Sequence, residues 1–252
     1  MFSLIGKIPK LITVISLFIS VFLLSFLLMG CLDTSSTYSD VYFASLSYNK
    51  SSGFYSEVEA KYKDSNSSST LAKMSVRIGY IATCVALDGK FTCTSFGSLL
   101  KLSSYSGISL LEDADDANDM DLVKIAKDIN ETCHPRVLMA AIIITLVLLV
   151  VLCYVSIPLL PGKNLGRKFI CLLSSANVLL WGLGAMLQHQ AANTSKQIVG
   201  SASMNIVSAS IGKRAEAMSW TAFSFLLIVC LGSFFTYIRE IRKSSLAMDP
   251  KV

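Results

Sequence analysis

The sequence predicts a membrane protein of the α+β class, in which a bundle of four transmembrane helices carries a small extracellular antiparallel β-sheet. Two observations lead to this fold class. The 252 residues are 53% hydrophobic and only 15% charged, whereas an ordinary soluble domain is about 25% charged. Between the apolar runs, several segments alternate polar and apolar residues with a period of two, which is typical of half-buried strands.

Four apolar runs account for the helices. Each run approaches the ~20 residues that a helix needs to cross ~30 Å of hydrocarbon, and a helix satisfies its own backbone hydrogen bonds in lipid. We expect transmembrane helices over residues 11–31, 137–157, 169–187 and 218–238. The first run also resembles a cleaved secretory signal. It is longer than the usual signal core of about 7–15 residues, so we interpret it as a retained helix.

The distribution of basic residues predicts the orientation. Lysines and arginines gather in residues 1–10, 158–168 and 239–252, and cytoplasmic segments carry this excess. The segments 32–136 and 188–217 are then extracellular. The Asn-x-Ser/Thr glycosylation sites all fall in these two outer segments: Asn49, Asn66, Asn130 and Asn193. We therefore expect a multi-pass glycoprotein with both termini in the cytoplasm.

The first outer segment has four stretches with the pattern of strands, separated by turns rich in Ser, Gly and Asn. They are Val41–Tyr48, Phe54–Tyr62, Val76–Val85 and Lys90–Phe96. A further short strand at residues 207–211 could join the sheet edge. Before the second transmembrane helix, Leu122, Ile125, Ala126 and Ile129 recur at helical spacing, which predicts a short amphipathic helix beginning near Asp121.

A β-hairpin is expected around Asp88-Gly89, since a type I′ turn needs positive φ at both central positions. In that register Cys84 faces Cys93 in a non-hydrogen-bonded pair, where opposed Cα atoms come closest and a disulfide fits with least strain. The alternative is two unpaired buried cysteines on either side of a turn. Two more cysteines of the outer segment, Cys31 and Cys133, either pair with each other or stay free.

The outer segment also contains a strongly acidic run. Its six carboxylates belong to Glu112, Asp113, Asp115, Asp116, Asp119 and Asp121. The spacing does not follow the ligand pattern of an EF-hand loop. One interpretation is a solvated loop whose charge favours a helix N-terminus. The other is a candidate cation-attracting segment, because a cluster of one sign raises the local concentration of counter-ions.

No set of catalytic residues emerges, so we expect no enzyme activity. The sequence has two histidines, and no Cys/His spacing resembles a metal site. We therefore expect no bound metal and no cofactor, with calcium at most a transported or loosely attracted ion. Asn177 is the most polar group inside the predicted membrane helices and is expected to hydrogen-bond to a neighbouring helix.

The arrangement resembles the claudin-type tetraspan proteins. They share the four helices, the long first outer loop with its strands, and a hairpin with two cysteines. Here Gly79 precedes Cys84 by five residues, and Cys93 follows nine later. The tryptophan usual in claudins between that glycine and the first cysteine is replaced by Tyr80-Ile81. The resemblance implies a claudin-like fold with the Gly79-Tyr80 motif and the disulfide in its outer domain.

A closer resemblance is to a fungal family of pheromone-induced calcium regulators and membrane-fusion proteins of mating cells. The stretches that carry it are 78–84 with Cys93, 122–127, 181–190 and 212–220. It implies a plasma-membrane glycoprotein that supports low-affinity calcium influx and cell fusion during mating. Its partners would be the lipid bilayer and other membrane proteins, such as calcium-channel components or further copies of itself, and not nucleic acid. The alternative function is a claudin-like adhesive protein, or a membrane-organising scaffold of the eisosome type, without a direct role in ion entry.

Overall fold

The computed structural model describes residues 8–53, 55–56, 74–87, 90–96, 122–132, 135–156 and 163–247. The chain forms two compact units. Unit 1 comprises residues 1–25, 136–185 and 219–252, and unit 2 comprises residues 26–135 and 186–218. Each unit is considered by itself below.

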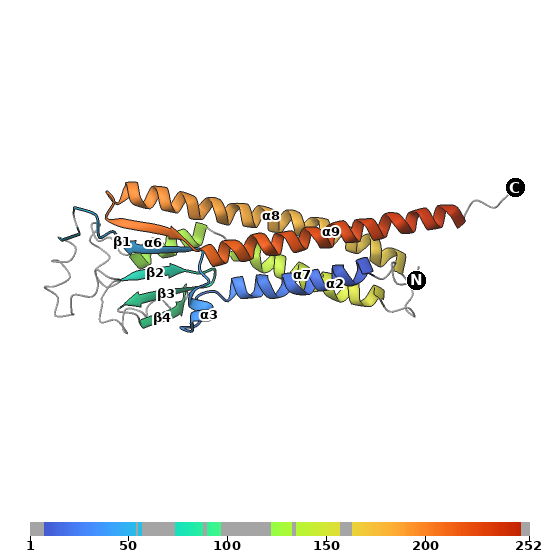
Figure 1. The fold of residues 1–252 in the computed structure, drawn as a ribbon, viewed down its shortest axis with the longest axis horizontal. Coiled ribbons are helices and arrows are strands. Elements are labelled where there is room, and N and C mark those ends of the chain that lie inside the picture. Colours follow the sequence, from blue (N-terminus) through green and yellow to red (C-terminus); the bar gives the residue numbers. More distant parts are fainter. Residues whose placement is uncertain are drawn as a thin grey trace. The chain divides into compact units, whose positions relative to one another are not determined.

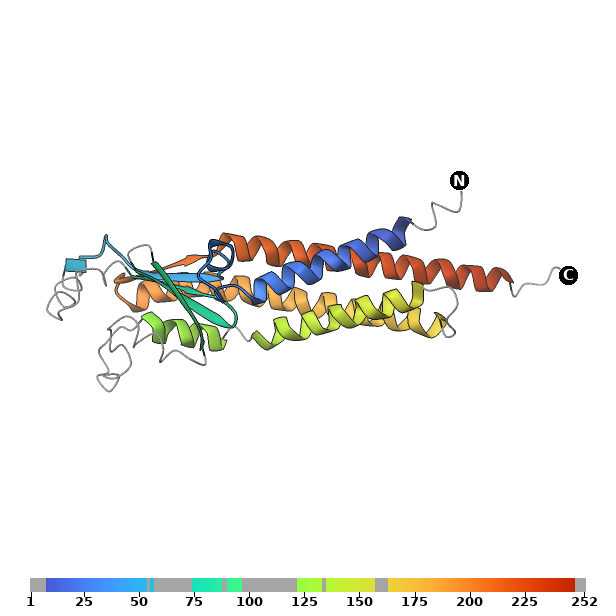
Figure 2. The same cartoon turned by 90° about the horizontal axis from the view of Figure 1, so that it is seen from below.

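Unit 1 is built from helices. These are α2 (Ile8–Leu28), α7 (Pro135–Ser156), and the parts of α8 (Lys163–Ala202) and α9 (Lys213–Ala247) that belong to it. Within the described part of the chain, four helices are long and apolar enough to cross a membrane, as the apolar runs predict. Figures 1 and 2 show these helices side by side.

Glycines allow two pairs of these helices to approach closely. A Cβ atom at Gly232 of α9 would lie 2.5 Å from the Oγ1 atom of Thr13 in α2, and a Cβ at Gly182 of α8 would lie 2.9 Å from the ring of Phe223 in α9. Small residues at such crossings let dispersion contacts form between helices in lipid, where burial of apolar surface drives no association.

Side-chain hydrogen bonds link helices in the described part of unit 1. Asn177 in α8 is fully buried, and its Nδ2 atom donates to Thr145 Oγ1 in α7 at 2.9 Å. Trp181, one turn further along α8, donates from Nε1 to the carbonyl oxygen of Ser219 in α9 at 3.3 Å. Asn177 thus makes the kind of interhelical contact that its position in the sequence suggests.

Helices α8 and α9 extend beyond the apolar runs. Residues 188–202, expected in an outer loop, continue α8 as far as Ala202. They are polar but rich in Ala and Gln, which are good helix formers, so loss of hydrophobicity does not end the helix. The end comes at Met204 and Asn205, which have φ angles of 49° and 62°. The Asn205 N–H bonds back to the Gly200 carbonyl oxygen at 2.7 Å, as in a left-handed helix cap.

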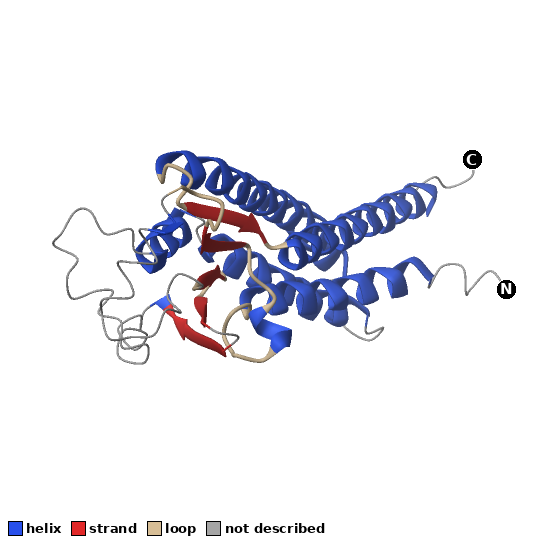
Figure 3. Cartoon of the chain, turned by 60° about the vertical axis from the view of Figure 1, so that its left-hand side comes forward, coloured by secondary structure: helices blue, strands red, loops and turns tan. Residues whose placement is uncertain are grey.

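Unit 2 contains a five-stranded antiparallel sheet in the order β4-β3-β2-β1-β5. The strands, red in Figure 3, are β1 (Ala44–Tyr48), β2 (Ser75–Ile78), β3 (Ala82–Leu87), β4 (Lys90–Ser95) and β5 (Val207–Ile211). Strand β5, from the segment 188–217, pairs with β1 and forms one edge of the sheet, as its alternating pattern predicts.

Two strand predictions need correction. The stretch Val76–Val85 is not one strand, because the chain reverses at Gly79: its N–H bonds to the Ala82 carbonyl oxygen at 2.9 Å, and β2 pairs with β3. The predicted strand Phe54–Tyr62 is wrong at Tyr55 and Ser56, which are helical. The remaining residues of that stretch lie outside the described part of the chain.

One face of the sheet is covered by the short helix α6 (Leu122–Thr132), which was predicted from its apolar spacing. Leu122, Val123 and Ala126 of α6 are buried in a core with residues of β1, β2 and β5. The alternating burial of β1 matches its alternating sequence. The sheet and α6 together therefore bury a core of their own, and they position the residues described next.

Candidate functional site

A disulfide joins β3 and β4. Cys84 pairs with Cys93 in the ladder, with their Cα atoms 4.0 Å apart and their sulfurs bonded. The pairs Leu87–Lys90, Ala86–Phe91 and Val85–Thr92 also have the predicted register. Asp88 and Gly89, which were expected to form the turn, lie outside the described residues.

The segment Gly30-Cys31 packs tightly behind this disulfide. A Cβ atom at Gly79 would lie 2.4 Å from the Gly30 carbonyl oxygen, and the Cys84 sulfur lies 3.4 Å from the Cys31 carbonyl oxygen. Cys31 is fully buried with a free thiol, and burial raises the pKa of that thiol to about 12. Cys31 is therefore an uncharged packing residue, and Cys133 lies outside the described residues.

The turn at Gly79-Tyr80 is held from two helices. Asn130 of α6 donates from Nδ2 to the carbonyl oxygens of Gly79 and Tyr80, each at 3.0 Å. The hydroxyl of Tyr80 donates to the Oε1 atom of Gln188 in α8. Tyr80 is itself buried, and its ring packs against that of Phe43. The Gly79-Tyr80 motif is thus the point at which the sheet, α6 and the unit 2 part of α8 are fastened together.

This geometry bears on one predicted glycosylation site. The Asn130 side-chain nitrogen, the atom that a glycan would occupy, donates two hydrogen bonds, and the residue is only 7% exposed. We therefore expect Asn130 to stay unmodified in the folded protein. Of the other sites, Asn49 donates to the Asn205 carbonyl oxygen at 3.0 Å and Asn193 is 2.9 Å from His189 in α8. Asn66 lies outside the described residues.

A second cluster is organised by Asp40, which follows the short helix α3 (Ser36–Ser39). Its carboxylate pairs with Arg77 of β2 at 2.8 Å and with Arg214 of α9 at 3.0 Å. The Arg77 guanidinium also lies over the rings of Tyr42 and Phe91, 5.0 Å and 4.6 Å from their centres. Such contacts supplement the ion pair because aromatic faces attract cations.

Arg214 has a physical explanation here. Arg214 lies in the segment 188–217, which is expected to be extracellular, and a basic residue there opposes the positive-inside tendency. Its pair with Asp40 supplies a specific contact that offsets this. Nearby, Glu216 of α9 pairs with His189 of α8 at 2.9 Å between Nδ1 and Oε1. The first residues of α9, which belong to unit 2, are therefore held by charged contacts within that unit.

Several of these residues escaped the sequence reasoning. Asp40, Arg77 and Gln188 are single polar residues far apart in the chain, and no spacing rule connects them. Conversely, the candidate cation-attracting run from Glu112 to Asp121 lies outside the described residues. Within the described part, no group of three or more His, Cys, Asp or Glu side chains could hold a metal ion.

The chain thus combines helices long and apolar enough to cross a membrane with a small disulfide-linked sheet, which defines a class of integral membrane protein. Residues 61–239 match the family described as Ca2+ regulator and membrane fusion protein Fig1. The chain is also 31% identical to Factor-induced gene 1 protein of Saccharomyces cerevisiae over 264 residues, covering 94% of this chain and 86% of the yeast protein. The chain belongs to the Fig1 family of Ca2+ regulators and membrane fusion proteins.

Proposed function

We propose that this protein is a plasma-membrane tetraspan glycoprotein that supports low-affinity calcium influx and membrane fusion during fungal mating. Its membership of a family of calcium regulators and membrane fusion proteins supports this function. The name of the yeast relative, Factor-induced gene 1 protein, supports a protein whose production is induced. No catalytic role is proposed, because this family is not a known enzyme family.

The observation that carries the proposal is the Cys84–Cys93 disulfide in unit 2. Disulfides persist in oxidising environments and are rare in the cytosol. The sheet would therefore face the outside of the cell, and the basic segments 1–10, 158–168 and 239–252 would face the cytoplasm. This is the orientation of a four-span protein with a claudin-like outer domain.

In the proposed mechanism, the sheet and the acidic run of the outer domain have different roles. The sheet would act as a rigid scaffold, since the disulfide joins β3 to β4, Asn130 holds the turn at Gly79, and Asp40 pairs with Arg77 of the central strand β2. The acidic run at residues 112–121 belongs to the same outer segment, where its charge would raise the local calcium concentration. The rigid sheet would then contact a calcium-channel component or another copy of the chain in the bilayer.

The second candidate is an adhesive protein or an eisosome-type scaffold without a direct role in ion entry. The internal pairing of Asp40 with Arg77 and of Glu216 with His189 favours it. These carboxylates are engaged in ion pairs that stabilise unit 2, so their charge is already balanced and does not attract a cation. A sheet held together in this way can organise a membrane contact without any role for the acidic run.

Neutralising the acidic run distinguishes the two candidate functions. The test compares the native chain with a variant in which Glu112, Asp113, Asp115, Asp116, Asp119 and Asp121 become the corresponding amides, expressed in mating cells that lack the protein. Induced calcium uptake and cell fusion are measured, with surface level checked in parallel. A control neutralises Glu57, Glu59 and Asp64 of the same outer segment.

Loss of uptake in the acidic-run variant alone, at normal surface level, would support calcium entry through this segment. Equal uptake by all three proteins would contradict a role for the acidic run. If fusion recovers while neither the native chain nor the variant restores uptake, the adhesive function is favoured instead.

A further inference from the structure

The turn that leads from α8 into β5 has an unusual backbone. Met204 and Asn205 have φ angles of 49° and 62°, in the left-handed region. Asparagine tolerates this conformation because its short polar side chain can bond locally, but a side chain as large as that of methionine rarely adopts it. The end of a helix alone does not explain Met204, since glycine or asparagine is usual there. Such a backbone persists only where surrounding contacts hold it, and it is concentrated at functional sites.

Hydrogen bonds to α8 and to the sheet hold this turn. The buried hydroxyl of Ser203 accepts from the first backbone N–H of β5 at 3.1 Å. Asn49, which follows β1, donates from its backbone N–H to the Ile206 carbonyl oxygen at 2.8 Å and from Nδ2 to the Asn205 carbonyl oxygen at 3.0 Å. The turn therefore presents Met204 on a fixed backbone.

The side chain at this position is apolar and exposed. Met204 is 73% exposed, the largest fraction among the large apolar side chains described in unit 2, and Ile198 near the end of α8 is 57% exposed. We call Ile198 and Met204 the apolar tip. Figure 3 shows α8 ending where the loop into β5 begins. Residues 188–202 add about 22 Å of helix after the apolar run, so the tip lies beyond the part of α8 that lipid would cover.

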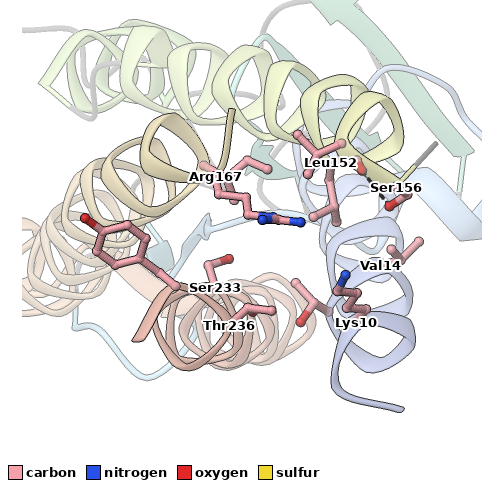
Figure 4. A pocket seen from close by; sticks show the side chains of 11 residues that line it. Lys10, Val14, Leu152, Ser156, Arg167, Ser233 and Thr236 are labelled. Atoms are coloured by element: carbon pink, nitrogen blue, oxygen red, sulfur yellow. Dashed lines mark hydrogen bonds between the residues drawn. The ribbon is translucent and has the colours of Figure 1, made fainter. Parts of the chain in front are cut away.

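Exposed apolar side chains in unit 1 have a different setting. They belong to helices that are apolar enough to cross a membrane, so lipid would cover them. Polar side chains there, such as those of Lys10 and Arg167, line a small inner cavity (Figure 4). The segment 188–205 is instead mostly polar or small. Met204 therefore stays in water unless a second apolar medium meets it.

Two lysines accompany the apolar tip. Lys50 directly follows Asn49, which is bonded to the turn, and Lys196 is exposed on α8. The segments 44–53 and 188–212, which form the turn and its supports, contain no Asp or Glu. Apolar side chains with cations beside them match the surface of a phospholipid bilayer, where acyl chains lie beneath phosphate groups. The core of a protein interface is instead enriched in aromatic residues, which the tip does not contain.

We propose that the apolar tip inserts into the headgroup layer of a facing membrane, with Lys50 and Lys196 on its phosphate groups. The proposal deepens the proposed function and rests on it, because that function places the turn outside the cell and includes membrane fusion. A chain anchored in one membrane by its helices would then touch a second membrane. Vesicle binding by purified protein requires neither calcium influx nor mating, so its failure is distinct from a failure of the proposed function.

The test uses the full-length chain in phosphatidylcholine nanodiscs and measures its flotation with vesicles of phosphatidylcholine and phosphatidylserine. The variant Met204→Gly removes the apolar side chain and suits the left-handed backbone, because glycine adopts positive φ freely. The matched control Asn205→Gly makes the same backbone change at the next residue and keeps Met204. A third variant, Lys50→Gln with Lys196→Gln, removes both cations. The Tm of each protein is measured in parallel.

We expect Asn205→Gly to bind vesicles as the native chain does, and Met204→Gly to bind roughly tenfold more weakly, since burial of one methionine side chain corresponds to about that factor. The lysine variant should bind more weakly by roughly fivefold for each lysine. We expect all of these proteins to keep the native Tm.

Three results would overturn the proposal. Equal binding by Met204→Gly and the native chain would remove the tip from the contact, and unchanged binding by the lysine variant would remove the phosphate groups. A lower Tm for Met204→Gly than for Asn205→Gly would show that the Met204 side chain packs within the fold. Flotation only with vesicles that themselves carry the chain would identify a second copy, and not a lipid surface, as the partner.

Discussion

The two units differ in what holds them together. Unit 2 relies on a disulfide, on charged pairs around Asp40 and on buried backbone contacts at Gly79. Unit 1 relies on close helix crossings at Gly182 and Gly232 and on isolated hydrogen bonds such as that of Asn177. A sheet with a small hydrophobic core needs specific cross-links, such as a disulfide or an ion pair, to be stable in water. Helices in lipid satisfy their own backbone hydrogen bonds, and their association depends mainly on close packing.

This contrast predicts that single substitutions should affect unit 2 more than unit 1. In unit 2, one residue often serves several elements at once, so its loss frees more than one contact. In unit 1, each helix already satisfies its backbone hydrogen bonds, and a lost side-chain contact leaves the helix intact. The predictions that follow test this difference.

The largest effect is expected from Gly212→Ala at the start of α9. A Cβ atom there would lie 1.6 Å from the Tyr42 carbonyl oxygen, which is backbone and cannot move aside. We expect a loss of at least about 3 kcal/mol in the free energy of unfolding, beyond the usual range for overpacking. Limited proteolysis of the purified chain measures it. Gly53→Ala, where a Cβ meets nothing within 4 Å, is the matched control, and equal protease resistance of the two variants would contradict the packing of unit 2.

An intermediate effect is expected from Asn130→Ala. It removes the donor to the carbonyl oxygens of Gly79 and Tyr80, and unpaired buried carbonyls cost about 1–3 kcal/mol. The control Thr132→Ala deletes the glycosylation signal but keeps the amide. We expect it to retain native stability and electrophoretic mobility. A faster-migrating Thr132→Ala protein would show that Asn130 carries a glycan, against its buried role.

The smallest effect is expected from Asn177→Leu in unit 1. Its hydrogen bond to Thr145 Oγ1 is a single interhelical contact, and such bonds in membrane helices average about 0.6 kcal/mol. Thermal unfolding in detergent should therefore show a smaller shift than Asn130→Ala gives. A larger shift for Asn177→Leu would reverse the comparison between the units.

Local patterns in the sequence were sufficient for much of this structure. The apolar runs predicted the four long helices, the spacing of Leu122 and Ala126 predicted α6, and the position of Cys84 and Cys93 about a turn predicted the β3–β4 register. These features depend on residues close in the chain. The period of hydrophobic residues and the residue types at turns depend directly on such local contacts.

Contacts between distant residues could not be predicted in this way. The pairing of Asp40 with Arg77 and Arg214 joins residues far apart in the chain. The sequence pattern of residues 76–85 predicts one continuous strand, but the chain reverses at Gly79. A glycine is required there because the backbone packs closely against Gly30, and the alternation of residues does not reveal this contact. A continuous apolar or alternating run therefore predicts an element without locating every turn within it.

The most direct test of the central claim concerns the disulfide. The claim is that an extracellular, Cys84–Cys93-linked unit 2 supports calcium influx. Cells that lack the protein receive the native chain, Cys84→Ser with Cys93→Ser, or the control Cys153→Ser with Cys171→Ser, which alters two free cysteines of unit 1. Surface level and induced calcium uptake are then measured together.

Loss of a disulfide that closes so short a loop should cost about 2–3 kcal/mol. We predict reduced surface delivery and loss of uptake for the Cys84, Cys93 variant, with the control unchanged. Normal surface level and normal uptake in the Cys84, Cys93 variant would contradict the account.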